Sequence, residues 1–195
     1  SKEFDSFFIR VTENRGYSAC SLIHKALKEK NIPIINFILE HIHAKSIYKF
    51  LPYITREEIS YSLFAAIDSG DIDIVKFMIK KIKERSGDIN FNHIWTYKTP
   101  LHYATEKGLL DIVKLLLENG ADYNIADNLY NNTPLFIAAQ EGYKEIVAIL
   151  LEKGANPNIR NIYNSTAIFA ATENNHIEIV KMLLNPSNPS NERFP

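Results

Sequence analysis

Residues 99–124 read TPLHYATEKGLLDIVKLLLENGADYN. This stretch combines a Thr-Pro pair and a His with two Gly residues and a run of Leu, Ile and Val. An enzyme would surround such an element with convergent polar groups, whereas a repeat protein would contain further copies of it. The first question is therefore whether the stretch returns elsewhere in the chain.

Related stretches begin at four other positions of the 195-residue chain. TPLFIAAQEGYKEIVAILLEKGANPN begins at 133 and TAIFAATENNHIEIVKMLL at 166, while YSLFAAIDSGDIDIVKFMI begins at 61 and the weaker SLIHKALKEKNIPIINFIL at 21. Successive copies therefore start 40, 38, 34 and 33 residues apart. A spacing that settles near 33 residues indicates a repeat array.

Each copy predicts two helices that pack against each other. Thr99 can cap the first amides of a helix, and Pro100 suits its first turn. Gly108 ends this helix with a left-handed residue, a place also held by Gly70, Gly142 and Asn175. The second helix carries one apolar stripe, made by Leu109, Ile112, Val113, Leu116 and Leu117. A small residue recurs where the two helices approach closely, at Ala26, Ala66, Ala104, Ala138 and Ala171.

The segments between copies are rich in Asn and lack a helical period, namely NIADNLYNNT (124–133) and NIRNIYNST (158–166). Such composition predicts hairpin-like loops. Asn131 and Asn164 stand two residues before the Thr, where Gly is usual.

The repeat unit resembles the ankyrin repeat. Residues 99–104 match its T-P-L-H-x-A pattern fully, and 133–138 match it except for the His. The resemblance implies an all-α, ankyrin-like helical repeat solenoid with hairpin-like loops, made of about five repeats over residues 17–184 with helix pairs beginning near 21, 61, 99, 133 and 166. It also implies that the protein recognises a protein partner through a concave surface of loop tips and first helices.

The ends of the chain and two insertions depart from the repeat. We expect residues 1–16 to cap the first repeat and residues 185–195 to be disordered. The insertions HIHAKSIYKFLPYI (41–54) and KKIKERSG (80–87) are interpreted as surface insertions, the second adding about one helical turn. The alternative is that the aromatic 41–54 extension forms part of a partner site. We also favour the view that the sequence is part of a longer protein.

Composition argues against several classes of partner. The 22 Lys and Arg residues are balanced by 23 Asp and Glu, giving a net charge of −1, so we expect no nucleic acid partner. No apolar run reaches the roughly 20 residues that a membrane span needs. The single Cys20 fits a reducing, cytoplasmic compartment. We further expect a monomer without a cofactor.

Chemistry-bearing residues are few and scattered. Cys20 and His24 are spaced for one helix face, but His24 falls at the His of the T-P-L-H pattern, which favours a structural role. His41 and His43 lack further ligands nearby in sequence, so we expect no metal site. No nucleotide-binding or zinc-protease motif occurs. We therefore predict that the chain is not an enzyme and has no catalytic residues.

Two other interpretations stay open. The chain could be an accessory domain that positions a substrate for a larger enzyme. It could also be an ankyrin-containing effector of an intracellular bacterium, acting on host proteins in the host cytoplasm, with which its content of Ile, Asn and Lys is compatible.

The expected protein-binding residues follow from the positions that the core does not require. On the first helices these are Tyr103, Glu106, Lys107, Ile137, Gln140 and Glu141, and on the loops Trp95, Tyr130 and Tyr163. Exposed Trp and Tyr are frequent anchors of interfaces. We therefore predict that Trp95, Tyr103 and Tyr130 form a continuous stripe that docks a protein.

Overall fold

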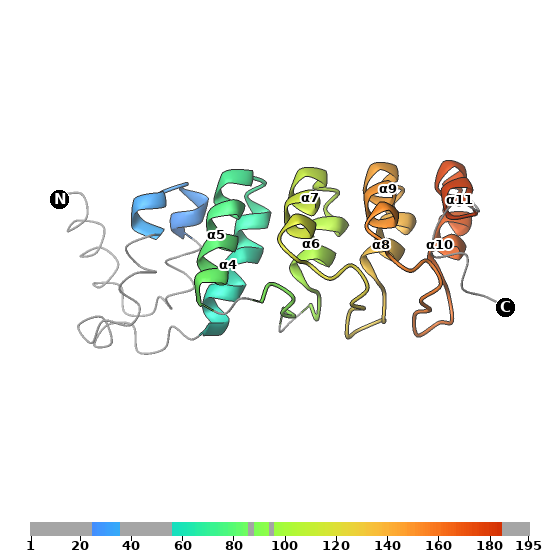
Figure 1. Ribbon diagram of the computed structural model, residues 1–195, viewed down its shortest axis with the longest axis horizontal. Helices are drawn as coiled ribbons and strands as arrows, with labels where there is room; N and C mark the ends of the chain where they lie inside the picture. The colour runs from blue at the N-terminus through green and yellow to red at the C-terminus, as the bar shows by residue number, and fades with distance from the viewer. Residues whose placement is uncertain (1–24, 36–55, 86–87, 94–95, 185–195) are drawn as a thin grey trace. The chain divides into compact units, whose positions relative to one another are not determined.

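The computed structural model describes residues 25–35, 56–85, 88–93 and 96–184 (Figure 1). These residues form helices joined by turns and loops, and none of them belongs to a β-strand. The chain divides into two compact units, Ser1–Asp88 and Ile89–Pro195. The predicted all-α class and the helical repeats are confirmed.

The first unit contains the longest helix pair. Residues 25–28 and 32–35 form short helical segments. Helix α4 (Arg56–Asp68) then packs on α5 (Ile72–Arg85), which has 14 residues against 9 in α7. The extra length of α5 falls on the KKIKER segment, as the sequence predicted. The α4 helix begins earlier than the repeat's first position at Tyr61, directly after Thr55.

The second unit contains three helix pairs in a row (Figure 1). The first helices are α6 (Pro100–Glu106), α8 (Pro134–Glu141) and α10 (Ala167–Glu173), and the second helices are α7 (Leu110–Glu118), α9 (Lys144–Glu152) and α11 (Ile177–Leu184). Within each pair the two helices pack together, and α8 packs between α6 and α10. Each first helix therefore lies beside a neighbour of the same kind.

The Thr-Pro pairs start the first helices as predicted. The hydroxyl of Thr99 accepts a hydrogen bond from the backbone N–H of His102, and Thr133 does the same for Phe136 at 3.2 Å. Both Thr side chains are buried, so these bonds satisfy polar groups that water cannot reach. Within the described residues the Thr166 hydroxyl makes no such cap bond.

Left-handed residues end the first helices. Gly70, Gly108 and Gly142 have φ values of 65°, 66° and 81°, and Asn175 has 59°, which confirms the prediction for all four. The same conformation recurs at Lys30, with φ 53°, although Lys rarely adopts it. Lys30 also forms an ion pair with Asp71, whose pKa is lowered because its carboxylate accepts a hydrogen bond from the Lys30 ammonium.

Small residues lie where the helices meet. The five recurring Ala residues are fully buried, with exposed fractions of 0%. Around them pack the aliphatic residues of the second helices, including Ile112, Val113 and Leu116, each at most 3% exposed. Leu109 is only half-buried, because it precedes α7 at the turn. Close approach of paired helices thus explains why Ala recurs.

Candidate protein-binding groove

The loop before α8 folds as a tight hairpin. The backbone N–H of Asp127 donates to the carbonyl of Asn132 at 2.8 Å, and Asn131 donates back to Asp127 at 3.0 Å. The Asp127 carboxylate also accepts bonds from the backbone N–H groups of Leu129 and Tyr130 through Oδ1. Asn131 takes a φ of 58°, which confirms its expected Gly-like place. These bonds fix the direction of the Tyr130 backbone.

The loop before α10 is built in the same way with Asn in place of Asp. Asn161 Oδ1 accepts from the backbone N–H groups of Tyr163 and Ser165, both at 3.0 Å. Asn161 N–H also donates to the carbonyl of Ser165, and Asn164 takes a φ of 60°. The hairpin-like loops predicted from the Asn-rich segments are confirmed.

Hydrogen bonds connect the two hairpins. The backbone N–H of Ile162 donates to the carbonyl of Tyr130 at 3.0 Å, and the side-chain amide of Asn131 donates to the carbonyl of Arg160 at 2.8 Å. Asn161 Nδ2 also donates to Asn132 Oδ1 at 3.0 Å. The hairpins therefore form one continuous wall rather than independent loops.

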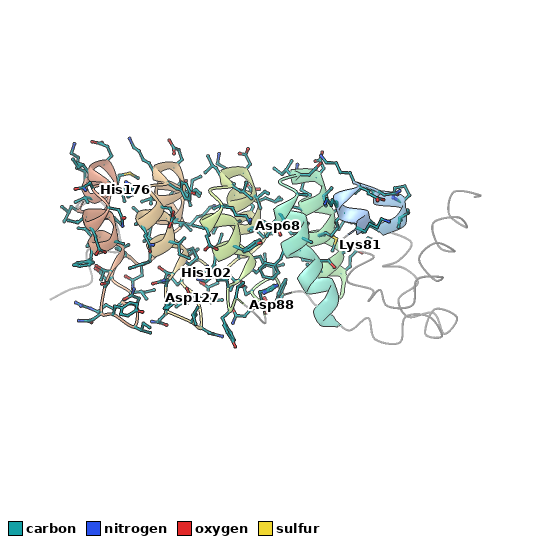
Figure 2. The ribbon with its side chains drawn as sticks, turned by 180° about the vertical axis from the view of Figure 1, so that it is seen from behind. Asp68, Lys81, Asp88, His102, Asp127 and His176 are labelled. Atoms are coloured by element: carbon teal, nitrogen blue, oxygen red, sulfur yellow. The ribbon has the colours of Figure 1, made fainter. Side chains whose placement is uncertain are left out.

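His102 belongs to helix α6 and connects this helix to the hairpin before α8 (Figure 2). Its ring is fully buried, with Nδ1 2.7 Å from Thr99 Oγ1 and Nε2 3.0 Å from the carbonyl oxygen of Asn132. Burial lowers the pKa of His102 to about 4, against a smaller opposing effect of the Asn132 carbonyl. The imidazole is therefore neutral at pH 7 and serves to position the hairpin.

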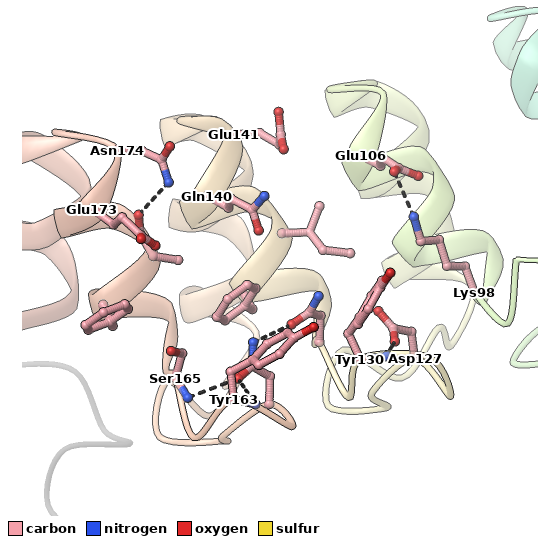
Figure 3. A pocket seen from close by; sticks show the side chains of 16 residues that line it. Lys98, Glu106, Asp127, Tyr130, Gln140, Glu141, Tyr163, Ser165, Glu173 and Asn174 are labelled. Carbon is pink, nitrogen blue, oxygen red and sulfur yellow. Dashed lines mark hydrogen bonds and ion pairs between the residues drawn. The ribbon is translucent and has the colours of Figure 1, made fainter.

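A groove of about 820 Å³ runs between the hairpins and the first helices of the second unit (Figure 3). The hairpins contribute the lower wall in this view, including Tyr130 and Tyr163, and the helices the upper wall. Its full lining is Lys98, Glu106, Asp127, Tyr130, Asn132, Phe136, Ile137, Gln140, Glu141, Asn161, Tyr163, Ser165, Phe169, Ala170, Glu173 and Asn174. The lining thus draws on the first helices α6, α8 and α10 and on the two hairpins.

Two aromatic rings lie together on the hairpin wall. The ring centroids of Tyr130 and Tyr163 are 6.3 Å apart and the ring planes differ by 27°. The residues stay 41% and 69% exposed, so their stacking leaves aromatic surface open to a partner. Phe169 on the opposite wall is 56% exposed. Such open aromatic surface is typical of interface anchors.

The charged residues of the groove are mostly acidic. Four carboxylates line it, at Glu106, Asp127, Glu141 and Glu173, against the single ammonium of Lys98, so the lining carries a net charge of −3. Lys98 Nζ lies 2.7 Å from Glu106 Oε1. Most of the negative charge therefore lies toward α8 and α10.

The structure brings six of the nine predicted binding residues into this groove: Glu106, Tyr130, Ile137, Gln140, Glu141 and Tyr163. Tyr103 and Lys107 lie outside its lining, where the Lys107 ammonium sits 4.9 Å from the centroid of the half-buried Tyr103 ring. Tyr130 therefore stacks on Tyr163. The predicted stripe of Trp95, Tyr103 and Tyr130 stays a prediction, because Trp95 lies outside the described residues.

Ile137 was predicted to lie outside the core, and this prediction was wrong. Ile137 is only 7% exposed, although it lines the groove floor. The reason is that α8 packs between α6 and α10, so residues 134–139 are all covered. The repeat register with Tyr103 gave the correct position of Ile137 along α8. It did not show that the neighbouring helices cover this position.

Sequence reasoning overlooked ten residues of the lining. Glu173 and Asn174 occupy, in the fifth repeat, the positions of Gln140 and Glu141 in the fourth, so the repeat register could have found them. Asp127 and Asn161 each begin a hairpin and could have been found from their equivalent spacing. The others are Lys98, Asn132, Phe136, Ser165, Phe169 and Ala170. The register relates these too, since Lys98, Asn132 and Ser165 each precede the Thr of a repeat, Phe136 and Phe169 are equivalent, and Ala170 corresponds to Ile137.

The residues considered for catalysis and metal binding, Cys20, His24, His41 and His43, lie outside the described residues. Within the described ranges, no group of three or more His, Cys, Asp or Glu side chains is arranged to hold a metal ion. The helices of these ranges also include none long and apolar enough to cross a membrane.

Comparison with known families agrees with the repeat geometry. A family model described as ankyrin repeats (3 copies) matches residues 23–127 and 126–193. Ankyrin repeats are generally protein–protein interaction modules and are typically not catalytic.

Proposed function

Because the chain belongs to the ankyrin-repeat family, we propose that it is a protein-recognition module whose partner binds in the groove of residues 98–174. The observation that carries this proposal is the exposed Tyr130–Tyr163 pair on a hairpin wall facing the first helices. Tyr offers a large contact area at a small cost in conformational entropy.

The wall that presents these rings is already ordered without a partner. The hydrogen bonds between the two hairpins and the buried contact of His102 with Asn132 hold it in place. A prearranged surface loses little conformational entropy on binding, which leaves more of the contact energy for affinity.

The proposal is tested by capturing partners from a cell lysate with the wild-type protein and with the double variant Tyr130→Ala/Tyr163→Ala. The variant should lose the captured protein, since truncating interface anchors costs more than about 1 kcal/mol each. Ile162→Ala is the matched control, because Ile162 is 60% exposed on the same hairpin and lies outside the groove lining. Equal capture by the double variant would show that the partner binds elsewhere.

A further inference from the structure

We propose that the groove selects an extended protein segment that carries arginine. This inference rests on the proposed function and adds the chemistry of the partner. It is drawn from the carboxylates on the first helices α8 and α10, which form the helix wall, from the Tyr130–Tyr163 pair and from the buried carboxylate of Asp127.

The helix wall presents carboxylates at the ends of consecutive first helices. Glu141 and Glu173 are exposed and line the groove at the ends of α8 and α10. Lys98 forms its ion pair with Glu106. In the part of the chain that the structure describes, neither Glu141 nor Glu173 forms an ion pair. A cationic side chain in the groove would therefore meet two carboxylates without displacing an existing partner.

The opposite wall favours arginine over lysine. The Tyr130 and Tyr163 rings lie on the hairpin side of the groove, and Glu141 and Glu173 lie at the helix ends on its other side (Figure 3). A guanidinium group is planar, stacks on aromatic rings and binds carboxylates through two parallel N–H bonds. An ammonium group has no flat face to stack. The lining thus offers aromatic rings and carboxylates, the two kinds of group that a guanidinium binds better than an ammonium.

Asp127 supplies an independent observation. It lines the groove but is only 2% exposed, and its Oδ1 accepts both backbone hydrogen bonds of the hairpin. Among the described residues, no group donates a hydrogen bond to the buried Oδ2 atom. Because this oxygen is closed to solvent, Asp127 adds negative charge beneath the lining, which favours a cationic ligand through its field rather than by direct contact.

The same features disfavour other occupants. An acidic or phosphorylated segment would be repelled by the net charge of −3 on the lining. A wholly apolar segment would bury the Glu141 and Glu173 carboxylates without giving them a partner, which costs free energy. Electrostatic attraction of an arginine segment would also speed its association at low salt.

The test selects a random dodecapeptide display library on the intact protein, in parallel with Tyr130→Ala/Tyr163→Ala and with Glu141→Gln/Glu173→Gln. Peptides that depend on the groove should be enriched in Arg over Lys. Replacing that Arg by citrulline, which keeps the shape but removes the charge, should weaken binding about tenfold, as should Glu141→Gln/Glu173→Gln. The control Glu118→Gln/Glu152→Gln neutralises two exposed carboxylates on α7 and α9 and should bind the peptides like the wild type.

The outcomes separate this inference from the proposed function. Peptides that need the two tyrosines but show no preference for Arg would overturn the arginine inference and leave the groove as a protein-binding site. Equal weakening by the Glu118→Gln/Glu152→Gln control would likewise overturn it, because the effect would then come from overall charge. If no selected peptide is lost on Tyr130→Ala/Tyr163→Ala, both the inference and the proposed function are wrong.

Discussion

The Nε2 atom of His102 lies 3.0 Å from the carbonyl oxygen of Asn132, and this contact joins helix α6 to the hairpin of the following repeat. A carbonyl only accepts, so Nε2 must donate, and in the neutral ring Nδ1 is then the acceptor facing the Thr99 hydroxyl at 2.7 Å. Protonation would remove that acceptor and place a charge in a fully buried site. The contact therefore depends on the neutral form of His102.

The first prediction is that acid weakens this fold through His102. Its pKa is about 4 in the folded protein, below the ordinary value of 6.5, so the unfolded chain binds more protons between these pH values. The free energy of unfolding should therefore fall as the pH drops from 6.5 to 4, by about 3 kcal/mol for this group alone. Urea denaturation at a series of pH values measures it.

His102→Phe is the control for that experiment, because Phe136 occupies the same position in the next repeat. The variant cannot titrate there, so its stability should change less over the same pH window. Carboxylates that titrate near pH 4 contribute to both proteins and cancel in the comparison. Parallel pH curves for the two proteins would show that His102 does not cause the effect.

A second prediction concerns the contact between paired helices. Ala104 is 0% exposed at the centre of the repeat, so Ala104→Leu should overpack it and lower the free energy of unfolding by about 1–3 kcal/mol. Ala148→Leu makes the same change on the exposed side of α9 and should have little effect. The comparison of their urea midpoints decides it: similar midpoints would rule out tight packing at Ala104.

The third prediction concerns Gly142, which combines a φ of 81° with a close neighbour. A Cβ there would lie 2.6 Å from Cε1 of His176, whose Nε2 is 3.0 Å from the carbonyl oxygen of Gln140. Gly142→Ala should therefore destabilise the protein by more than Gly120→Ala, where φ is 94° but no atom lies within 4 Å. The second substitution measures the backbone cost alone, at about 1 kcal/mol.

The close contact with His176 can be separated from the backbone cost at Gly142. If His176→Ala is added, the extra loss caused by Gly142→Ala should shrink to the value measured at Gly120. Thermal melting of the four variants gives this comparison. An equal loss at both glycines from the start would mean that the His176 ring moves away at no cost.

A fourth prediction is that replacing Tyr97 by Asn stabilises the protein. Tyr97 has a φ of 56° at the hairpin position where Asn131 and Asn164 have 58° and 60°. Because Asn tolerates this conformation better than Tyr, Tyr97→Asn should raise the free energy of unfolding by about 1 kcal/mol. Chemical denaturation checks it. A loss of stability would instead show that the half-exposed Tyr97 ring makes contacts worth more than the strain.

The repeat register made the local structure predictable. Thr99 caps a helix through its hydroxyl, and Gly108 and Asn131 have left-handed conformations that few residues adopt. Their spacing alone therefore located a helix start, a helix end and a hairpin. The same logic explains why the buried positions of Ala104 and its counterparts could be predicted.

The groove was harder to predict because it depends on contacts between repeats. Ile137 and Tyr103 are equivalent in sequence, yet only Ile137 belongs to the lining. The stacking of Tyr130 on Tyr163 likewise requires two hairpins to be joined by hydrogen bonds. Neither feature is visible in the pattern of a single repeat.

The most direct test of the binding groove is a map of backbone amide chemical shifts in the ¹⁵N-labelled protein, titrated with a partner obtained by capture. We predict that the largest changes fall on the two sides of the groove, in the hairpin residues 128–132 and 161–165 and at the helix ends 140–141 and 173–174. Changes confined to the second helices α7, α9 and α11, with the hairpins unaffected, would contradict it.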